Sequence, residues 1–397
     1  MSWTSNLVAP ITPAGRGAIA TVAAVGPDVL ASVARRFTPA AGKPLTSFAV
    51  GRIVLGRFRG LETEEELVVG LVAHDHLEVH CHGGSAAVEA VIAALVAEGC
   101  QPITWQEFAQ LLEDDSLATE ARIALAAATT ERTATILLEQ YQGALGRAIR
   151  LVQADLERGN VAQAQEQLAA LLGRSSLGKH LTQPWKVVLA GRPNVGKSSL
   201  INALVGYSRS IVFDQPGTTR DILTATTAID GWPIDLSDTA GLRAARDAIE
   251  HAGIERSRTE LAATDLVLLV FEAAVTWSAH SVSGIRSRSE RTTDEALLAE
   301  LPADKPRLVI YNKCDLGLPL ADGRPSGLAV SAIRGTGLDA LLAAIALTLV
   351  PEPPEPGVAV PFTQRQIAAL SRAAQLLTSG KAVEAGRQLA ALFTGGL

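Results

Sequence analysis

The sequence has 397 residues, which is enough for two or three domains. Hydrophobic residues make up 48% and charged residues 19%, a globular composition that excludes a disordered chain. The net charge of −6 argues against a protein coated with positive charge for nucleic acid, although a local basic patch could still exist. No apolar run approaches the roughly 20 residues that span a bilayer, and three cysteines suit a reducing compartment, so we predict a cytoplasmic protein without membrane contact.

Residues 1–112 are predicted to form a small α+β domain. Short β-like runs (AIATVAAV, GRIVLGRF, ELVVGLVA) accompany one alanine-rich helical run, SAAVEAVIAALVAEG. The segment HDHLEVHCH is rich in metal-binding side chains, so a zinc site is one interpretation. Alternate residues of a strand face opposite sides, however, and neighbours cannot all converge on one ion. A strand followed by a turn at Gly83-Gly84 is the favoured interpretation.

The rest of the chain predicts a helical domain that carries an inserted α/β domain. Residues 113–182 have apolar residues at helical spacing, and residues 183–351 alternate short apolar strands with helical stretches, as in a parallel sheet. Asp230-Gly231 predicts a tight hairpin within that sheet. After the linker PEPPEPG, residues 357–397 return to helix as a shortened second part of the helical domain. The polar stretch from Thr276 to Glu295 is expected to be a flexible surface loop.

The stretch GRPNVGKSSL follows a predicted strand and precedes a predicted helix, which is the setting of a phosphate-binding P-loop. Its glycines let backbone amides approach phosphates. Lys197 is expected to reach the β and γ phosphates, and the Ser198 hydroxyl to bind Mg²⁺. The residues expected to contact phosphate here are Gly191, Asn194, Val195, Gly196, Lys197, Ser198 and Ser199.

Four further motifs follow in the order expected of a GTPase. GTTRD offers Thr219 as a second magnesium ligand, and DTAG offers Asp238 for the metal and the Gly241 amide for the γ-phosphate. NKCD and VSA follow later strands and are expected to bind guanine. Asp315 can accept two hydrogen bonds that guanine donates and adenine does not, which selects GTP over ATP. The predicted guanine-binding residues are Asn312, Lys313, Asp315, Ser331 and Ala332.

The residue after DTAG is Leu242, where Ras-type switches have a water-orienting glutamine. A carboxylate further along the segment, such as Glu250, Glu255 or Glu260, could orient water instead, or each could be an ordinary surface charge. The sequence offers no obvious arginine finger. Asn194 could hold a monovalent cation beside the phosphates, or it could simply form the turn.

These motifs resemble the MnmE (TrmE) family of tRNA-modification GTPases. The likeness runs over nearly the whole chain and is strongest from 185 to 260. It also includes VAPITPAGRGAIATV, LEVHCHGGSAAVEAVIAALVAEGCQPITWQEF and TTERTATILLEQYQGAL. The resemblance implies a potassium-stimulated GTPase in which Asn194 helps to hold K⁺, Glu250 is the general base, and two G domains dimerise across the nucleotide.

The resemblance implies further partners as well. The N-terminal domain would bind a formylated tetrahydrofolate, with Arg16 as a contact, and mediate homodimerisation. The protein would then act with an MnmG-like flavoprotein on the wobble uridine of tRNA.

Two departures from the family pattern bear on function. Family members end in Cys-x-Gly-Lys, whereas this sequence ends GRQLAALFTGGL, and an acidic stretch at Glu113, Asp114 and Asp115 stands where the family is usually basic. The leading hypothesis is a GTPase in tRNA modification, favoured by the GRG and CHGG segments. The alternative, favoured by the missing cysteine, is a regulatory GTPase with another partner, such as a switch in ribosome assembly.

Overall fold

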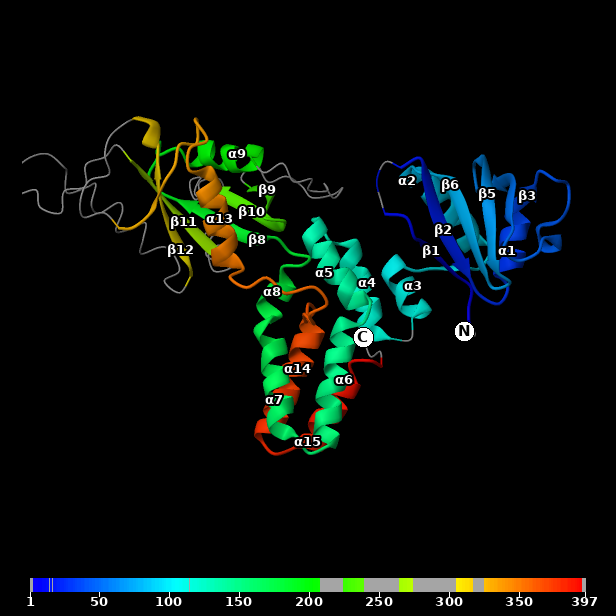
Figure 1. Cartoon of the computed structure of the whole chain (residues 1–397). Helices are drawn as coiled ribbons and strands as arrows, with labels where there is room; N and C mark the ends of the chain where they lie inside the picture. The colour runs from blue at the N-terminus through cyan, green and yellow to red at the C-terminus, as the bar shows by residue number, and fades with distance from the viewer. Residues whose placement is uncertain are drawn as a thin grey trace, which may run out of the picture. The chain divides into compact units, whose positions relative to one another are not determined.

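The computed structural model describes residues 3–13, 15, 17–113, 115–207, 224–238, 264–273, 305–316 and 325–394. Contacts divide the chain into two compact units, Met1–Asp114 and Asp115–Leu397. Figure 1 labels the helices and strands of both units. The predicted boundaries inside the second unit, near 182 and 357, stay a prediction.

The first unit is built on a seven-stranded sheet in the order β3-β4-β5-β6-β2-β1-β7. All of its pairings are antiparallel except that of β1 with β7. Its elements are β1 (Leu7–Pro10), β2 (Ile19–Val25), α1 (Val29–Arg36), β3 (Phe37–Pro39), η1 (Leu45–Ser47), β4 (Ile53–Arg59), β5 (Glu64–Ala73), β6 (His76–His82), α2 (Ser85–Ala97), β7 (Gln101–Pro102) and α3 (Trp105–Leu112).

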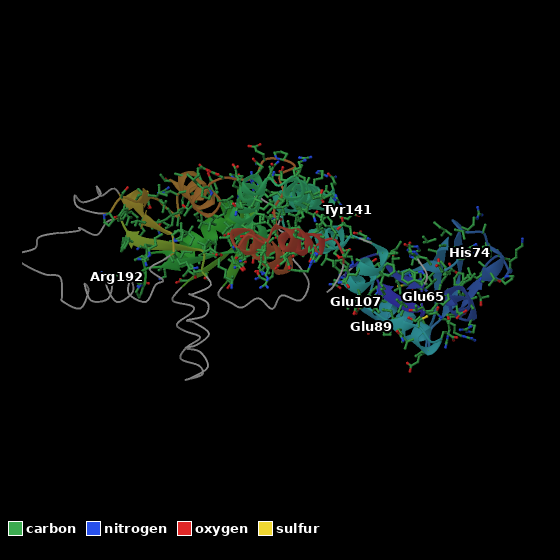
Figure 2. The ribbon with its side chains drawn as sticks, turned by 90° about the horizontal axis from the view of Figure 1, so that it is seen from below. Glu65, His74, Glu89, Glu107, Tyr141 and Arg192 are labelled. Carbon is green, nitrogen blue, oxygen red and sulfur yellow. The ribbon has the colours of Figure 1, made fainter. Side chains whose placement is uncertain are left out.

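Strand alternation divides the apolar residues of this sheet between two faces. One face buries its side chains with those of α1 and α2 in a single hydrophobic core. On the other face Ala9, Ala23 and Val25 pack with Phe108 of α3. The sequence pattern predicted only the alanine-rich helix of this unit, so α1 and α3 are additions. Helix α3 begins with a capping box, in which the side chains of Thr104 and Glu107 each accept a hydrogen bond from the other residue's backbone amide. Glu107 is labelled in Figure 2.

The histidine-rich segment forms β6, which confirms the strand prediction. His80 Nδ1 lies 3.0 Å from Thr21 Oγ1, and the His82 ring is paired with Glu65. Along the strand, Leu77, Val79 and Cys81 are buried and alternate with Glu78 and the histidines. Within the described ranges no group of three or more His, Cys, Asp or Glu side chains could hold a metal ion.

Helices from both ends of the second unit pack together into what we call the helical bundle. The elements before the sheet are α4 (Ser116–Ala126), α5 (Glu131–Tyr141), α6 (Ala144–Glu157), α7 (Val161–Gly173) and α8 (Ser175–Lys179), and those after it are α14 (Gln364–Thr378) and α15 (Ala382–Ala390). Helix α14 packs on α7, and α15 on α6 (Figure 1). None of the helices among the described residues is long and apolar enough to cross a membrane.

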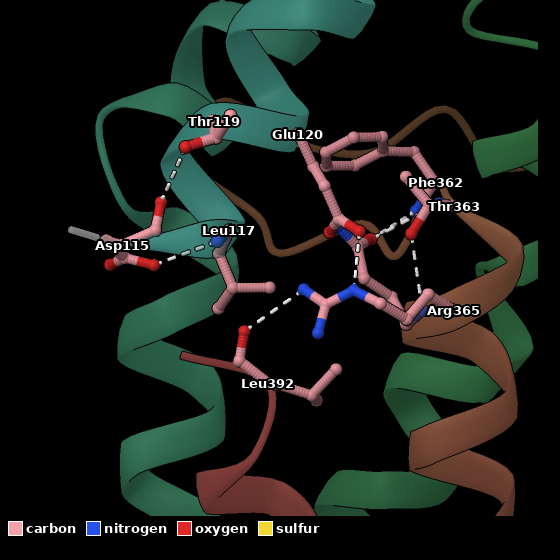
Figure 3. A network of polar contacts seen from close by, with 9 residues as sticks. Asp115, Leu117, Thr119, Glu120, Phe362, Thr363, Arg365 and Leu392 are labelled. Atoms are coloured by element: carbon pink, nitrogen blue, oxygen red, sulfur yellow. Dashed lines mark hydrogen bonds and ion pairs between the residues drawn. The ribbon is translucent and has the colours of Figure 1, made fainter. Parts of the chain in front are cut away.

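A buried network that we call the helical clamp joins the two ends of the bundle (Figure 3). Glu120 of α4 is only 8% exposed. Its carboxylate accepts hydrogen bonds from Arg365 Nε at 2.6 Å and Gln366 Nε2 at 2.7 Å. Arg365 also donates to the Leu392 carbonyl, and Gln366 Oε1 accepts from the Phe362 amide. The clamp therefore connects residues almost 250 positions apart in the sequence.

In the sequence, the strands of a six-stranded sheet stand between the two sets of helices, and the sheet has the order β13-β12-β11-β8-β10-β9. Its elements are β8 (Trp185–Ala190), α9 (Lys197–Tyr207), β9 (Thr224–Ile229), β10 (Trp232–Asp238), β11 (Leu266–Glu272), β12 (Arg307–Asn312), η2 (Cys314–Leu316), β13 (Leu328–Ala329) and α13 (Leu338–Leu349). Every pairing is parallel except β9 with β10.

The predicted hairpin is confirmed. Trp232 pairs with Ile229, so Asp230 and Gly231 form a two-residue loop. Their φ angles of +50° and +75° are those of a type I′ turn, which Asp-Gly favours. The predicted loop from Thr276 to Glu295 lies outside the described residues.

Candidate guanine-nucleotide site

The P-loop joins β8 to α9, and two of its glycines are required by close approaches. A Cβ on Gly191 would lie 2.3 Å from the Val270 carbonyl oxygen of β11. Gly196 has a φ of +92°, and a Cβ there would lie 2.4 Å from Asn312 Nδ2. Asn194 also has a positive φ, +65°, a conformation that asparagine tolerates better than most residues. The backbone turn thus fits the glycines and asparagine at their sequence positions.

Lys197 begins α9, and its side chain is folded back under the loop. It is only 5% exposed. Its Nζ donates to the carbonyls of Gly191 and Arg192, both at 3.1 Å, and lies 3.6 Å from Asp238 Oδ1. Arg192 is labelled in Figure 2. A buried ammonium held largely by backbone carbonyls can exchange those partners for phosphate oxygens.

Ser198 and Asp238 come from different elements and meet at the start of α9. Ser198 Oγ donates to Asp238 Oδ2 at 3.4 Å. Asp238 ends β10, beside Leu189 of β8. A hydroxyl and a carboxylate oxygen are the donors that Mg²⁺ takes in P-loop proteins, where phosphates and water complete its coordination. The donor set therefore fits the ion.

The predicted guanine-binding residues surround a cavity of about 80 Å³. The residues that line it are Gly196, Ser199, Asn312, Lys313, Asp315, Leu316, Ser331, Ala332 and Ile333. Asn312 is almost fully buried and ties this cavity to the P-loop. Its Nδ2 donates to the Val195 carbonyl at 2.9 Å, and its Oδ1 accepts from the Ala332 amide at 3.2 Å.

Asp315 stands exposed at this cavity and is oriented by Ser331. Ser331 Oγ donates to Asp315 Oδ1 at 2.6 Å, and the same hydroxyl oxygen accepts from the Arg334 amide. The hydrogen bond from Ser331 lowers the pKa of Asp315 below its ordinary value, and the Arg334 charge acts in the same direction. The carboxylate is thus kept ionised and able to accept hydrogen bonds from a ligand.

Four predicted site residues lie outside the described residues: Thr219, Gly241, Glu250 and Arg16. Leu242 lies outside them too. The structure brings together the other predicted residues in two groups. The phosphate group is the P-loop with Lys197, Ser198 and Asp238, and the guanine group is the cavity beside Asn312.

Sequence reasoning did not single out two apolar residues of the guanine cavity. Leu316 is 57% exposed and Ile333 is 82% exposed, although both line the cavity. Each directly flanks a motif, Leu316 after NKCD and Ile333 after VSA. That adjacency was the available signal, because an aliphatic side chain beside a planar base can cover its face.

Comparison with known proteins places both units. A family model described as "GTP-binding protein TrmE N-terminus" matches residues 6–111, and one described as "50S ribosome-binding GTPase" matches residues 186–313. A protein named tRNA modification GTPase MnmE from Prochlorococcus marinus (strain MIT 9303) is 34% identical over 410 residues, covering 90% of this chain and 84% of the relative. The protein of the same name from Chloroflexus aurantiacus is 32% identical, covering 95% and 89%.

The P-loop between β8 and α9, together with the matched GTPase family, makes this protein a P-loop GTPase. Its identity with the two MnmE relatives is above 30% and extends over most of each chain, which identifies the family within the P-loop GTPases. The chain belongs to the MnmE family.

Proposed function

We propose that this GTPase takes part in C5 modification of the wobble uridine of tRNA. The observation that carries the proposal is the likeness to MnmE proteins across both units, with the TrmE N-terminal match and the GTPase match in one chain. A GTPase domain alone would be shared with many switches. The N-terminal match is what narrows the choice.

In GTP hydrolysis the residues of the phosphate group and the guanine group would bind and orient the nucleotide. Lys197 would leave the P-loop carbonyls for the β and γ phosphates, while Ser198 and Asp238 would hold Mg²⁺ with Thr219. The ion would offset negative charge on the phosphates. Asp315 would accept hydrogen bonds from the guanine edge, with Ser331 fixing the carboxylate and Asn312 holding the cavity against the P-loop.

We propose that residues other than Leu242 activate the attacking water. Glu250 would act as general base, and Asn194 would help to bind K⁺ in place of an arginine finger. Two G domains would dimerise across the nucleotide. The support is the resemblance in sequence together with the exposed Asn194 of the P-loop.

The wider reaction would involve partners of the first unit. That unit would bind a formylated tetrahydrofolate near Arg16 and form the homodimer. An MnmG-like flavoprotein and tRNA would complete the assembly.

Complementation tests the proposed modification. A strain lacking its own modification GTPase would receive this chain or, as a matched negative, Lys197→Ala. We expect the wild type to restore the modified uridine in tRNA nucleosides and the variant to fail. Soluble wild-type protein that hydrolyses GTP yet restores no modification would overturn the proposal.

Turnover in K⁺ and in Na⁺ tests the proposed chemistry. We expect hydrolysis at least about tenfold faster in K⁺, since a charge supplied at the transition state has large effects in GTPases. Glu250→Ala should lower turnover by about 10²-fold or more, the usual contribution of a general base. Glu260→Ala, on the same segment, is the matched control. Equal turnover in both ions and in both variants would remove the proposed roles.

The second candidate is a regulatory GTPase that binds the ribosome or another partner without modifying tRNA. The match of residues 186–313 to the family model named for 50S ribosome binding favours it. Co-sedimentation with ribosomal particles in GTP, together with failed complementation, would select this candidate.

A further inference from the structure

The tip of the β9–β10 hairpin rests on Arg132 of α5. Arg132 Nη1 donates to Asp230 Oδ2 at 2.8 Å. The guanidinium carbon lies 5.1 Å from the centroid of the Trp232 ring, a cation–π contact. Gly231 completes the contact, because a Cβ there would lie only 3.0 Å from Arg132 Cβ. The hairpin tip therefore meets one arginine of the helical bundle with three successive residues.

The surroundings make this arginine important for the position of the tip. Trp232 is 1% exposed, so the ring beneath the guanidinium is fixed in the core. A cavity of about 960 Å³ flanks the contact and is lined by α5, the hairpin and linker residues that include Pro353 and Pro354. The Arg132 and Asp230 side chains are 37% and 57% exposed, so their ion pair is screened by solvent, and the guanidinium contact with the buried Trp232 ring contributes more to where the tip lies.

Strand β10 connects this contact to the nucleotide site. It starts at Trp232 and ends at Asp238, a distance of about 20 Å for seven extended residues. It pairs with β9 along one edge and with β8 along the other. A strand paired on both edges moves as a unit rather than bending residue by residue. Its far end holds the carboxylate that contacts Ser198 and Lys197.

We propose that Arg132 is a positioning residue for the metal end of the nucleotide site. By holding the hairpin tip through Asp230 and Trp232, it helps to set the position of β10 and with it the place of Asp238, while backbone pairing with β8 and β9 sets the register. The same connection runs in reverse, because coupling between two sites is reciprocal. A ligand that shifts Asp238 therefore changes the contacts of Arg132 with Asp230 and Trp232. Helix α5, which carries Arg132, thereby responds to the state of the nucleotide site.

This inference deepens the proposed role of Ser198 and Asp238 and rests on it. It separates two properties of nucleotide binding. Affinity for GDP without Mg²⁺ depends on the guanine cavity and P-loop amides, which β10 does not carry. The tightening of binding by Mg²⁺ depends on Asp238, which β10 does carry. A general loss of structure would weaken both, whereas loss of positioning weakens the second alone.

The experiment measures GDP affinity by calorimetry across a Mg²⁺ titration in the full chain. For Arg132→Ala we expect the Mg²⁺ concentration at half-maximal tightening to rise about fivefold, with magnesium-free GDP affinity within about twofold of wild type. Arg132→Lys keeps the charge and loses the planar guanidinium over Trp232, so its shift should be intermediate. Arg158→Ala is the matched control, because this exposed arginine pairs with Asp155 elsewhere in the bundle.

Asp230→Asn gives a second route if Arg132→Ala folds poorly, since asparagine tolerates the positive φ of this turn. Its shift should not add to that of Arg132→Ala, because both remove one contact. Equal magnesium dependence in Arg132→Ala and Arg158→Ala would overturn the positioning role. Equal weakening with and without Mg²⁺ would overturn it too. If wild-type affinity shows no magnesium dependence, the proposed metal role of Ser198 and Asp238 fails instead.

Discussion

The helical clamp and the P-loop each bury a charged side chain, and they surround it differently. In the clamp both oxygens of Glu120 accept hydrogen bonds from side chains at 2.6 and 2.7 Å. In the P-loop Lys197 donates to two backbone carbonyls at 3.1 Å and lies 3.6 Å from Asp238. In the clamp, the donors to the buried charge are side chains of α14, a helix that is far away in the sequence. The P-loop holds its charge mainly with backbone carbonyls of its own turn.

This difference separates a structural role from a binding role. A buried charge with short, charge-assisted partners is costly to disturb, so it fixes one arrangement of the chain. A buried ammonium held by carbonyls can exchange them for a ligand that carries full negative charge. Substitutions in the two clusters should therefore change different measured quantities.

Lys197→Ala should have the largest effect of all. We expect GTP turnover to fall by about 10³-fold, as when a donor to developing charge is removed from an active site. The free energy of unfolding should change by less than about 1 kcal/mol, because the carbonyls that held Lys197 belong to a local turn. Steady-state turnover and urea unfolding measure the two quantities. Lys381→Ala, at the exposed lysine that precedes α15 as its N-cap residue, is the control, and an equal loss of turnover there would contradict the assignment.

Glu120→Ala should show the reverse pattern. Breaking a buried pair costs 3–5 kcal/mol, and because Arg365 is partly exposed we expect about 3 kcal/mol in the free energy of unfolding. GDP affinity of the folded variant should stay near that of wild type. Glu384→Ala, which removes an exposed pair with Lys381, should cost less than about 0.5 kcal/mol. Similar losses from both variants would show that the clamp does not hold the bundle together.

Local signals explain what the sequence predicted well. The strands of the six-stranded sheet are short apolar runs, the hairpin has its Asp-Gly pair, and the P-loop stands between a strand and a helix. Each of these is encoded within about ten residues. Helix α3 could have been found in the same way from Thr104 and Glu107, whose three-residue spacing is that of a capping box.

Long-range contacts explain what the sequence did not reveal. Glu120 follows the acidic stretch of Glu113, Asp114 and Asp115, which was interpreted by its charge alone. In the structure Asp115 caps α4, and Glu120 accepts a hydrogen bond from Arg365, which follows the six-stranded sheet in the sequence. Nothing near Glu120 in the sequence distinguishes it from a solvated charge. The contact of Arg132 with the hairpin was hidden for the same reason.

Gly178→Ala tests a second contact that is expected to stabilise the helical bundle. A Cβ on Gly178 of α8 would lie 1.8 Å from the Pro361 carbonyl oxygen, next to the segment that Gln366 holds. Relief requires backbone movement, so we expect a loss of about 2 kcal/mol in the free energy of unfolding. Gly173→Ala meets nothing within 4 Å and should be neutral or slightly stabilising. Equal unfolding curves for the two variants would contradict this close approach.

Ser331→Ala should have the smallest effect, a change in one pKa at the guanine cavity. The hydrogen bond from Ser331 lowers the pKa of Asp315 below its ordinary value of 3.8. The ionised Asp315 carboxylate therefore contributes to the stability of the folded protein above that pH, and this contribution is lost as pH falls through the lowered pKa. Removing the hydroxyl should raise the pKa of Asp315 toward 3.8, as measured by NMR of the side-chain carboxyl carbon.

The matched variant is Arg334→Ala, which removes the weaker charge effect and keeps the hydroxyl, so it should raise the pKa of Asp315 by less. An unchanged pKa in Ser331→Ala would mean that this hydroxyl does not orient the carboxylate. In its hydrogen-bond partners, Asp315 at the guanine cavity is intermediate between Glu120 of the clamp and Lys197 of the P-loop. The Asp315 carboxylate has a side-chain donor, Ser331, as Glu120 has in the clamp, yet it stands exposed at the cavity where the purine edge would bind.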